Sequence, residues 1–310
     1  MTVRRPVLVL TGGSGLLATN WAFLMREHWD VVLLVHQKNV RIPGVEACRT
    51  DLSDPDTLCR LFRALKPNVV VHTVAMTDVD RCESESELAW QVNVHLAATV
   101  AAACDRVQAT LLHVSTDQLF DGSVRMADEK EPARPLNAYG TTKHAAEEAV
   151  LSGCHDALVV RTNFYGFGHR FRRSFSDWIL RGLQSDAELR LFDDVFYTPI
   201  YVDHLIEACH GLLEAGAKGV IHVVGGERLS KFQFGVSLAS AFELDGSRIV
   251  PISIDSVPLK AARPPDMSLS AALASKLLGK PMPSTIDGLK ALRRVSQGER
   301  PGALLAAVTT

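Results

Sequence analysis

Short apolar runs that alternate with longer helical patterns constrain this chain most. Six runs rich in Val, Leu and Ile occur at residues 7–11, 31–35, 69–73, 110–115, 158–162 and 220–224. Helical patterns lie between them, at residues 16–28, 55–65, 85–104, 138–151 and 203–215. Near-continuous apolar strands that alternate with helices indicate a parallel sheet covered by helices on both faces. The pattern therefore predicts a doubly wound, Rossmann-like α/β fold.

The regular alternation ends near residue 165, and this divides the chain. We predict a dinucleotide-binding domain over residues 1–165, with residues 196–224 returning to it. Residues 166–195 and 225–300 are predicted to form a smaller substrate-binding lobe. Residues 301–310 carry no strong signal and are expected to be a loosely held tail. A chain of 310 residues is long for one compact unit, so two lobes that share a core are expected.

Composition excludes several classes of protein. The formal net charge of -2 leaves no basic excess to meet the phosphates of a nucleic acid. The apolar segments are short and flanked by charges, and none reaches the roughly 20 residues that a membrane helix needs. The six cysteines are scattered without a C-x-x-C pair and the eleven histidines are dispersed. We therefore expect buried free thiols of a cytoplasmic protein and no metal site.

The first apolar run leads directly into a glycine-rich stretch, TGGSGLLA, at residues 11–18. Small residues at positions 12, 15 and 18 let the backbone turn tightly against a pyrophosphate that faces the N-terminus of the next helix. Gly12, Ser14, Gly15 and Leu16 are therefore candidate cofactor-binding residues. The spacing is G-x-x-G-x-x-A, and a glycine turn that binds nothing remains the alternative.

The end of the second apolar run bears on the choice of cofactor. It reads Val35-His36-Gln37-Lys38, without the acidic residue that would hold the ribose diol of NAD. Lys38 instead suits the 2′-phosphate of NADP, so we expect NADP(H) to be preferred, with NAD(H) possible. A solvated loop lysine is the alternative. Asp51 and Leu52 are placed to contact an adenine ring, although Asp51 equally fits a turn or a helix cap.

Tyr139 and Lys143 are four residues apart, so a helix presents them on one face. An apolar run upstream ends in Ser115-Thr116-Asp117, at the carboxyl edge where doubly wound sheets bind ligands. A phenol has a pKa of about 10, and we expect the ammonium of Lys143 to lower it. Thr116 then binds a substrate oxygen while Tyr139 transfers the proton in a nicotinamide-dependent reduction. Taken singly, Thr116 fits a turn and Tyr139 fits packing.

These motifs together resemble those of the extended short-chain dehydrogenase/reductases, and within them the dTDP-4-dehydrorhamnose reductase subgroup. The likeness covers nearly the whole chain. The matching segments are VHTVAMTDVDRCESESELAWQVN (71–93), HVSTDQLFDG (113–122), PLNAYGTTKHAAEEAV (135–150), RTNFYGFG (161–168), GVIHVVGGERLSKFQFGVSLASAF (219–242) and RPPDMSLSAALASKLLG (263–279).

The resemblance implies a function and a set of site residues. The expected reaction is the NADPH-dependent reduction of a keto group on a nucleotide-linked deoxy sugar, by a possible homodimer. Thr116, Tyr139 and Lys143 match the catalytic triad. Residues implied near the nicotinamide are Ala75, Thr77, Asn163, Phe164 and Tyr165. Residues implied near the sugar nucleotide are Asp117, Gln118, Phe196, Tyr197 and Arg263.

Gln118 departs from the related dehydratases, which carry a glutamate that removes a proton next to the ketone. An amide is not a general base, so dehydration is disfavoured. The reductases usually have tyrosine here, so Gln118 also suggests an altered sugar pocket. Two alternatives stay open at this point: a nucleotide-sugar epimerase, and a non-catalytic regulatory subunit resembling the beta subunit of methionine adenosyltransferase.

Overall fold

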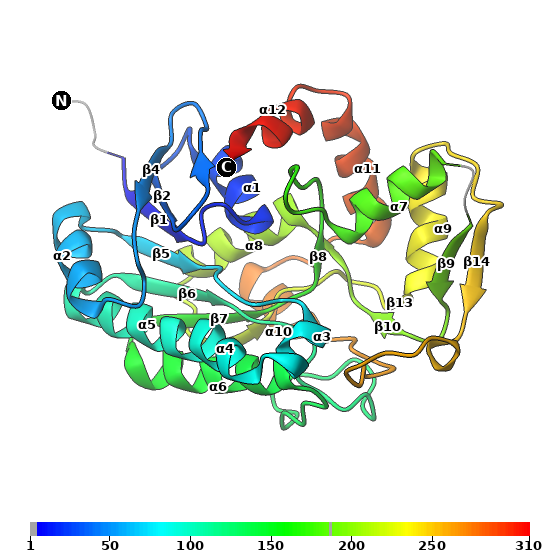
Figure 1. Cartoon of the computed structure of the whole chain (residues 1–310), viewed down its shortest axis with the longest axis horizontal. Helices are drawn as coiled ribbons and strands as arrows, with labels where there is room; N and C mark the ends of the chain where they lie inside the picture. The colour runs from blue at the N-terminus through cyan, green and yellow to red at the C-terminus, as the bar shows by residue number, and fades with distance from the viewer. Residues whose placement is uncertain (1–4, 186–187) are drawn as a thin grey trace.

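The computed structural model describes residues 5–185 and 188–310, and it confirms the doubly wound fold (Figure 1). A sheet of seven strands has the order β12-β7-β6-β5-β1-β2-β4, and every neighbouring pair is parallel. Its strands are β1 Val7–Thr11, β2 Asp30–Val35, β4 Glu46–Arg49, β5 Val69–His72, β6 Thr110–Val114, β7 Ala157–Arg161 and β12 Gly219–His222.

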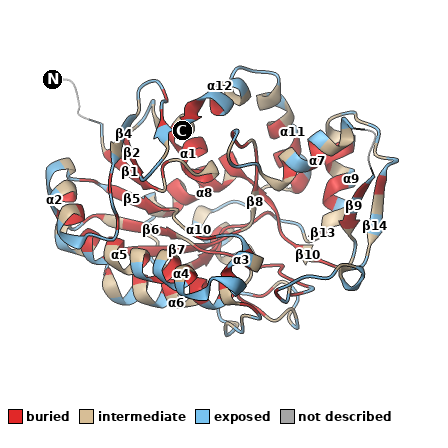
Figure 2. Ribbon diagram, in the orientation of Figure 1, coloured by how far each residue is buried: buried red, intermediate tan, exposed pale blue. Residues whose placement is uncertain are grey.

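Alternate strand residues pack into two separate hydrophobic clusters, one on each face of the sheet. Leu8 and Leu10 join the cluster on the first face, whereas Val7 and Val9 join the cluster on the second. Helices cover both faces, and Figure 2 shows the strands between them as buried. The first face is covered by α1 (Leu16–Met25) and α8 (Val202–Glu214), and the second by α2 (Pro55–Leu65), α5 (Leu96–Val107) and α6 (Ala138–Gly153).

The helical pattern expected at residues 85–104 is three elements in the structure. A helix α4 (Ser86–Trp90) continues into a π-helical turn η1 (Gln91–His95) and then into α5; a short helix α3 (Val79–Ser84) precedes them. The extra residue of a π-turn shifts the side chains on the helix face, and such turns are frequent at functional sites. Here the turn places Asn93 in the interior.

The remaining elements include α7, α9, β9 and β14, which lie on the right of Figure 1, and α10, which lies near its centre. They are β8 Phe164–Tyr165, α7 Phe175–Leu183, β9 Leu189–Phe192, β10 Phe196–Tyr197, β11 Ile200–Tyr201, β13 Leu229–Ser230, α9 Lys231–Ala241, β14 Ile249–Ile252, η2 Ile254–Ser256, α10 Ala272–Leu278 and α11 Thr285–Ser296. Leu191, Phe234 and Ile249 belong to the same hydrophobic cluster as the first face of the sheet. A shared core therefore joins the two parts. The division into two lobes stays a proposal, and two residues of the 166–195 segment lie outside the described residues.

The expectation of a loosely held tail is wrong. Residues Arg300–Ala307 form α12, and β15 (Val308–Thr309) pairs antiparallel with β3 (Asn39–Val40). The Arg300 guanidinium forms an ion pair with Asp203 on α8, with a nitrogen–oxygen distance of 2.7 Å. These partners are distant in sequence, so the local pattern of residues 301–310 gave no sign of them.

Three further properties complete the description of the fold. Over residues 5–185 and 188–310, no helix is long and apolar enough to cross a bilayer. The same residues contain no group of three or more His, Cys, Asp or Glu side chains placed to hold a metal ion. All six cysteines are free thiols, and five of them are buried.

Candidate active site

The glycine loop leaves the carboxyl end of β1 in a conformation that requires glycine. Gly12 has a φ of +68°, and a Cβ there would lie 2.9 Å from Oγ1 of Thr73. The Gly15 amide donates to the Gly12 carbonyl at 2.7 Å, which closes the turn. Gly15 is the N-cap of α1 and supplies no side-chain cap, so the helix begins without a side-chain partner for its first amides. The loop therefore fits a pyrophosphate, which those amides can bind.

A second segment holds this loop, and the sequence analysis missed its central residue. The Nε2 atom of His169 lies 3.0 Å from the carbonyl oxygen of Ser14, and the ring is fully buried. The side-chain amide of Asn20 on α1 donates to the Phe167 carbonyl at 2.8 Å. Lys38 also contacts the segment that contains His169, because its Nζ lies 3.7 Å from the ring centroid of Phe171. His169 directly follows the RTNFYGFG run, which is the signal that could have found it.

Asp51 adopts the turn arrangement that its sequence left open. Its Oδ1 accepts hydrogen bonds from the backbone amide of Ser53 at 2.9 Å and from its hydroxyl at 2.7 Å. These bonds lower the pKa of the exposed Asp51 carboxyl. Leu52 beside it is buried. An adenine contact by Asp51 and Leu52 stays a prediction.

The side chains of Thr116, Tyr139 and Lys143 are all buried. Burial raises the pKa of Tyr139 to about 12, and a hydrogen bond with Thr116 opposes the rise. Burial also lowers the pKa of Lys143 to about 8, against the charge of Glu147. Burial is the largest influence on the pKa of this phenol. An effect of Lys143 on Tyr139 stays a prediction.

Two stacked histidines lie beneath Lys143. Its Nζ donates to the Val114 carbonyl at 2.8 Å and lies 3.2 Å from Nε2 of His113. The rings of His113 and His72 stack with centroids 5.3 Å apart, and Nδ1 of His72 lies 2.8 Å from Oγ1 of Thr11. Burial lowers the pKa of both histidines, so both are neutral. The strand register places Thr11, His72 and His113 side by side, which only the sheet order reveals.

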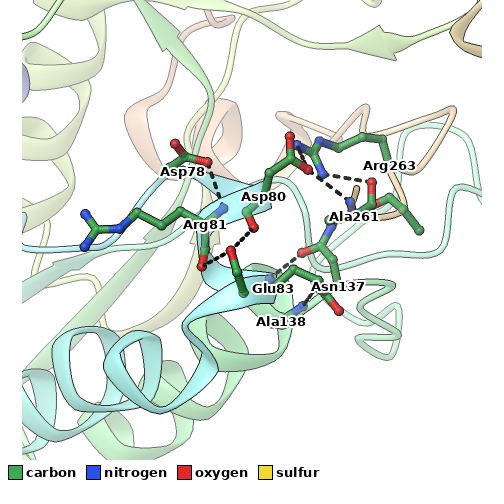
Figure 3. A network of polar contacts seen from close by, with 11 residues as sticks. Asp78, Asp80, Arg81, Glu83, Asn137, Ala138, Ala261 and Arg263 are labelled. Carbon is green, nitrogen blue, oxygen red and sulfur yellow. Dashed lines mark hydrogen bonds and ion pairs between the residues drawn. The ribbon is translucent and has the colours of Figure 1, made fainter. Parts of the chain in front are cut away.

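The helix that carries Tyr139 and Lys143 is anchored at its N-cap residue, Asn137. Oδ1 of Asn137 accepts from the Gly140 amide at 2.9 Å and so caps α6. Its side-chain amide donates to the Ala262 carbonyl at 2.8 Å, which joins the cap to the C-terminal half of the chain. Figure 3 also shows Glu83 of α3, whose carboxylate accepts from the Ala138 amide at 3.0 Å.

Arg263, which the resemblance implies near the substrate, is part of the same network. Its guanidinium forms an ion pair with Asp80 of α3 at 3.0 Å (Figure 3). Asp80 also accepts from the Ala261 amide at 3.0 Å, and these partners lower the pKa of its carboxyl. The structure therefore places Arg263 in a contact that holds residues 261–263 against α3.

Asn93 positions the loop that the resemblance implies near the nicotinamide. Its Oδ1 accepts from the Met76 amide at 2.7 Å, and its side-chain amide donates to Oγ1 of Thr142 on α6 at 2.9 Å. This residue therefore couples the loop with Ala75 and Thr77 to the catalytic helix. Ala75 is half-buried and Thr77 is exposed.

Asp117 is the buried acid of the site. Its Oδ2 accepts from the side-chain amide of Asn163 at 2.6 Å. Burial raises its pKa to about 6, and the charge of Lys231 opposes the rise. The Tyr197 hydroxyl and Oε1 of Gln118 are buried without a hydrogen-bond partner, which marks them as groups a ligand can satisfy.

The remaining residues of the expected set have different surroundings. The Arg228 guanidinium lies over the Phe196 ring, 3.5 Å from its centroid. Phe164 is half-buried on β8. Tyr165 packs in the core and its hydroxyl donates to the Thr285 carbonyl at 3.4 Å, so this hydroxyl is engaged by α11.

Comparison with known proteins now decides the family. The family described as RmlD substrate binding domain matches residues 6–296. The chain belongs to this family. The dTDP-4-dehydrorhamnose reductase of Mycobacterium tuberculosis is 32% identical over 283 residues, covering 89% of this chain and 87% of the relative. The fold and the family expected from the sequence are both confirmed.

Two other proteins bear on the cofactor and on the alternatives. A crystal structure of dTDP-4-dehydrorhamnose reductase from Bacillus anthracis, in complex with NADP, is similar with a TM-score of 0.83 and 26% identity, covering 93% of this chain and 98% of that one. The methionine adenosyltransferase 2 subunit beta of Danio rerio is 28% identical over 292 residues, covering 92% of this chain and 88% of the relative.

Proposed function

We propose that this protein reduces a keto group on a nucleotide-linked deoxy sugar with NADPH, NADH being the lesser alternative. The observation that carries the proposal is the joint burial of Thr116, Tyr139 and Lys143. Lys143 is connected through the stacked rings of His113 and His72 to Thr11, where the loop shaped for a pyrophosphate begins. The reductase from M. tuberculosis and the NADP complex from B. anthracis support the substrate class and the cofactor.

The residues divide the chemistry between them. A bound nicotinamide supplies the hydride. Gly12, Gly15 and the first amides of α1 hold the pyrophosphate, and the Lys143 ammonium donates to ribose hydroxyls. The Thr116 hydroxyl donates to the keto oxygen, while Tyr139 provides the proton that converts it to an alcohol. A Tyr139 pKa of about 12 keeps the phenol protonated at neutral pH, as an acid in a reduction must be.

Gln118 separates this reaction from dehydration. The position after Asp117 carries an amide, which accepts and donates hydrogen bonds but does not remove a proton from carbon. With Oε1 of Gln118 buried and unpartnered, the residue is better suited to hold a sugar hydroxyl. Reduction, rather than loss of water, is therefore the proposed outcome.

The test is NADPH consumption with a dTDP-linked 4-keto-6-deoxy sugar, in wild type and in Tyr139→Phe. We expect the variant to lose about 10²- to 10⁴-fold in kcat while its Kd for NADPH is kept. Tyr201→Phe is the matched control, because it removes a hydroxyl that donates to Asp203 at 3.0 Å, outside the site. Tight NADPH binding without sugar reduction, together with a co-purifying enzyme, would instead identify a regulatory subunit.

A cytoplasmic location and a possible homodimer belong to the same proposal. The six free thiols support a reducing compartment. Light scattering on the purified protein measures the number of chains in the particle. A mass of one chain would contradict the dimer without affecting the proposed reaction.

A further inference from the structure

Lys231 is a charged residue at the substrate side that the triad does not include. It is the first residue of α9, whose N-cap Ser230 accepts from the Gln233 amide at 3.0 Å. The Lys231 amide also donates to the Val195 carbonyl at 3.1 Å. These two hydrogen bonds therefore fix the backbone position from which the Lys231 side chain extends.

Aromatic rings hold the ammonium group of Lys231. Its Nζ lies 3.2 Å from the centroid of the Tyr197 ring and 5.2 Å from that of Phe175. Contact with ring faces favours a cation that has lost part of its water. Burial lowers the pKa of Lys231 to about 8, and the negative charge of Asp117 opposes this change.

Asp117 follows the carboxyl end of β6, and its charge and that of Lys231 act on each other. Its carboxylate accepts from Asn163 and, at 3.3 Å, from the Thr116 hydroxyl. The charge of Lys231 is the largest influence that keeps Asp117 ionised against burial. Tyr139 and Tyr197 are the other titratable groups that this carboxylate influences.

The two charges attract each other without direct contact. No ion pair with a nitrogen–oxygen distance of 4.0 Å or less joins Lys231 to Asp117, both of which lie in the described part of the chain. The hydroxyl of Tyr197, whose ring contacts the Lys231 ammonium, is buried and has no hydrogen-bond partner. Buried polar groups are normally hydrogen-bonded, so this arrangement is incomplete without a ligand that carries several oxygens.

We propose that Lys231 is a specificity-determining residue that works with Asp117 to bind two neighbouring oxygens of the sugar ring, a step that rests on the proposed function. An ammonium only donates and a carboxylate only accepts, so together they match the two sides of a vicinal diol. Asp117 directly follows Thr116, so the diol bound there is next to the reacting keto carbon. The Tyr197 hydroxyl provides a third hydrogen bond. A site built to bind hydroxyls rejects analogues that lack them.

The experiment compares Lys231→Met, Lys231→Arg, Asp117→Asn and the double variant Lys231→Met/Asp117→Asn. Methionine keeps an aliphatic contact with Tyr197 but removes the charge. We expect Lys231→Met to raise KM for the keto sugar at least about tenfold, with kcat within about threefold and Kd for NADPH unchanged. The acid limb of kcat/KM shifts to higher pH, because Asp117 loses the cation that favours its ionised form.

Two further variants distinguish a role of Lys231 in binding the sugar from a role in packing. Lys231→Arg keeps a positive charge that can contact the Tyr197 ring, so we expect its KM to lie closer to that of wild type than the KM of Lys231→Met does. If the pair acts as a unit, the KM of the double variant is no higher than the KM of the single variant that binds the keto sugar less well. Lys218→Met, which removes an exposed lysine paired with Asp156 at 3.0 Å, is the control for loss of charge and changes neither quantity.

Each result decides between the readings. A wild type that reduces no 4-keto sugar overturns the proposed function and this inference with it. An active wild type with Lys231→Met at unchanged KM and unchanged pH profile overturns the inference alone. If the melting temperature shows that Lys231→Met does not fold, Asp117→Asn is the deciding variant. An unchanged KM in Asp117→Asn contradicts the pair. A raised KM, together with loss of the acid limb from the pH profile of kcat/KM, supports the pair.

Discussion

At the scale of single residues, we expect Lys38 to determine the preference for NADPH over NADH. Lys38→Glu places a carboxylate where the 2′-phosphate of NADP is expected, so the phosphate is repelled. We predict that Kd for NADPH rises at least about tenfold while Kd for NADH changes by less than about threefold. Fluorescence titration with both nucleotides measures this.

The control for Lys38→Glu is a charge reversal far from the loop. Lys66→Glu alters an exposed residue at the end of α2 and leaves both dissociation constants as in wild type. An unchanged preference for NADPH in Lys38→Glu would show that Lys38 interacts with Phe171 alone and does not read the phosphate.

The buried charge of Asp117 is expected to lower the stability of the fold while it serves substrate binding. Its pKa rises from 3.8 to about 6 on folding, so the folded state binds its proton more tightly than the unfolded state. The contribution of this carboxyl to the free energy of unfolding is therefore fully present below pH 4 and is lost as the pH rises through 6. Asp117→Asn removes the buried charge, and we expect the variant to be about 1–3 kcal/mol more stable than wild type at pH 8.

Denaturant unfolding at several pH values checks this sign. The advantage of Asp117→Asn shrinks as pH falls from 6 to 4, because the wild-type carboxyl is then protonated in both states. A variant that is equally stabilised at pH 4 and pH 8 would show that the charge of Asp117 is not the cause.

At the scale of secondary-structure elements, the position of α6 decides the geometry of the triad. A buried ion pair fixes its middle, where the Arg161 guanidinium of β7 contacts Glu147 at 2.7 Å. Removing one partner of such a pair typically costs about 3–5 kcal/mol, since the other charge stays buried. The cap at Asn137 fixes the first turn, which carries Tyr139.

Asn137→Ala removes both the cap of α6 and the bond to Ala262. We predict a loss of about 1–2 kcal/mol in the free energy of unfolding and roughly a tenfold decrease in kcat, because a shifted first turn moves Tyr139. Ser284→Ala is the matched control: it removes the cap of α11, where Ser284 accepts from the Asp287 amide at 3.2 Å. We expect a similar loss of stability there with kcat unchanged, and equal kcat losses in both variants would disprove a specific role for Asn137.

At the scale of the whole molecule, the C-terminal segment is part of the fold. Leu304 and Leu305 are adjacent on α12, but Leu304 is 0% exposed and Leu305 is 44% exposed. We predict that Leu304→Ala costs about 2–5 kcal/mol of unfolding free energy, whereas Leu305→Ala costs less than about 0.5 kcal/mol. Thermal and denaturant unfolding measure both, and equal small effects would restore the picture of a loose tail.

Local pattern was sufficient for most of the central sheet, whereas the catalytic role of Thr116, Tyr139 and Lys143 stays a prediction. The apolar runs predicted every strand of the central sheet except β4, because strands buried on both faces are apolar throughout. The Tyr139–Lys143 spacing predicted two side chains on one helix face, and the apolar run before Thr116 predicted a strand end, because helix periodicity and strand ends are local rules. The burial of all three residues was not predicted. His169, Asn93 and Lys231 were missed, since each acts on a residue far away in the chain.

The sequence by itself determined the doubly wound sheet, the glycine loop and the side chains that we propose to react. The tertiary structure decided their chemical state. Burial, which depends on all the packed elements together, raises the pKa of Tyr139 and Asp117 and lowers that of Lys143 and Lys231. It also decided the partners of Arg263 and Lys231, because Asp80 of α3 and Asp117 after β6 are far from them in sequence and come near them only when the chain is folded.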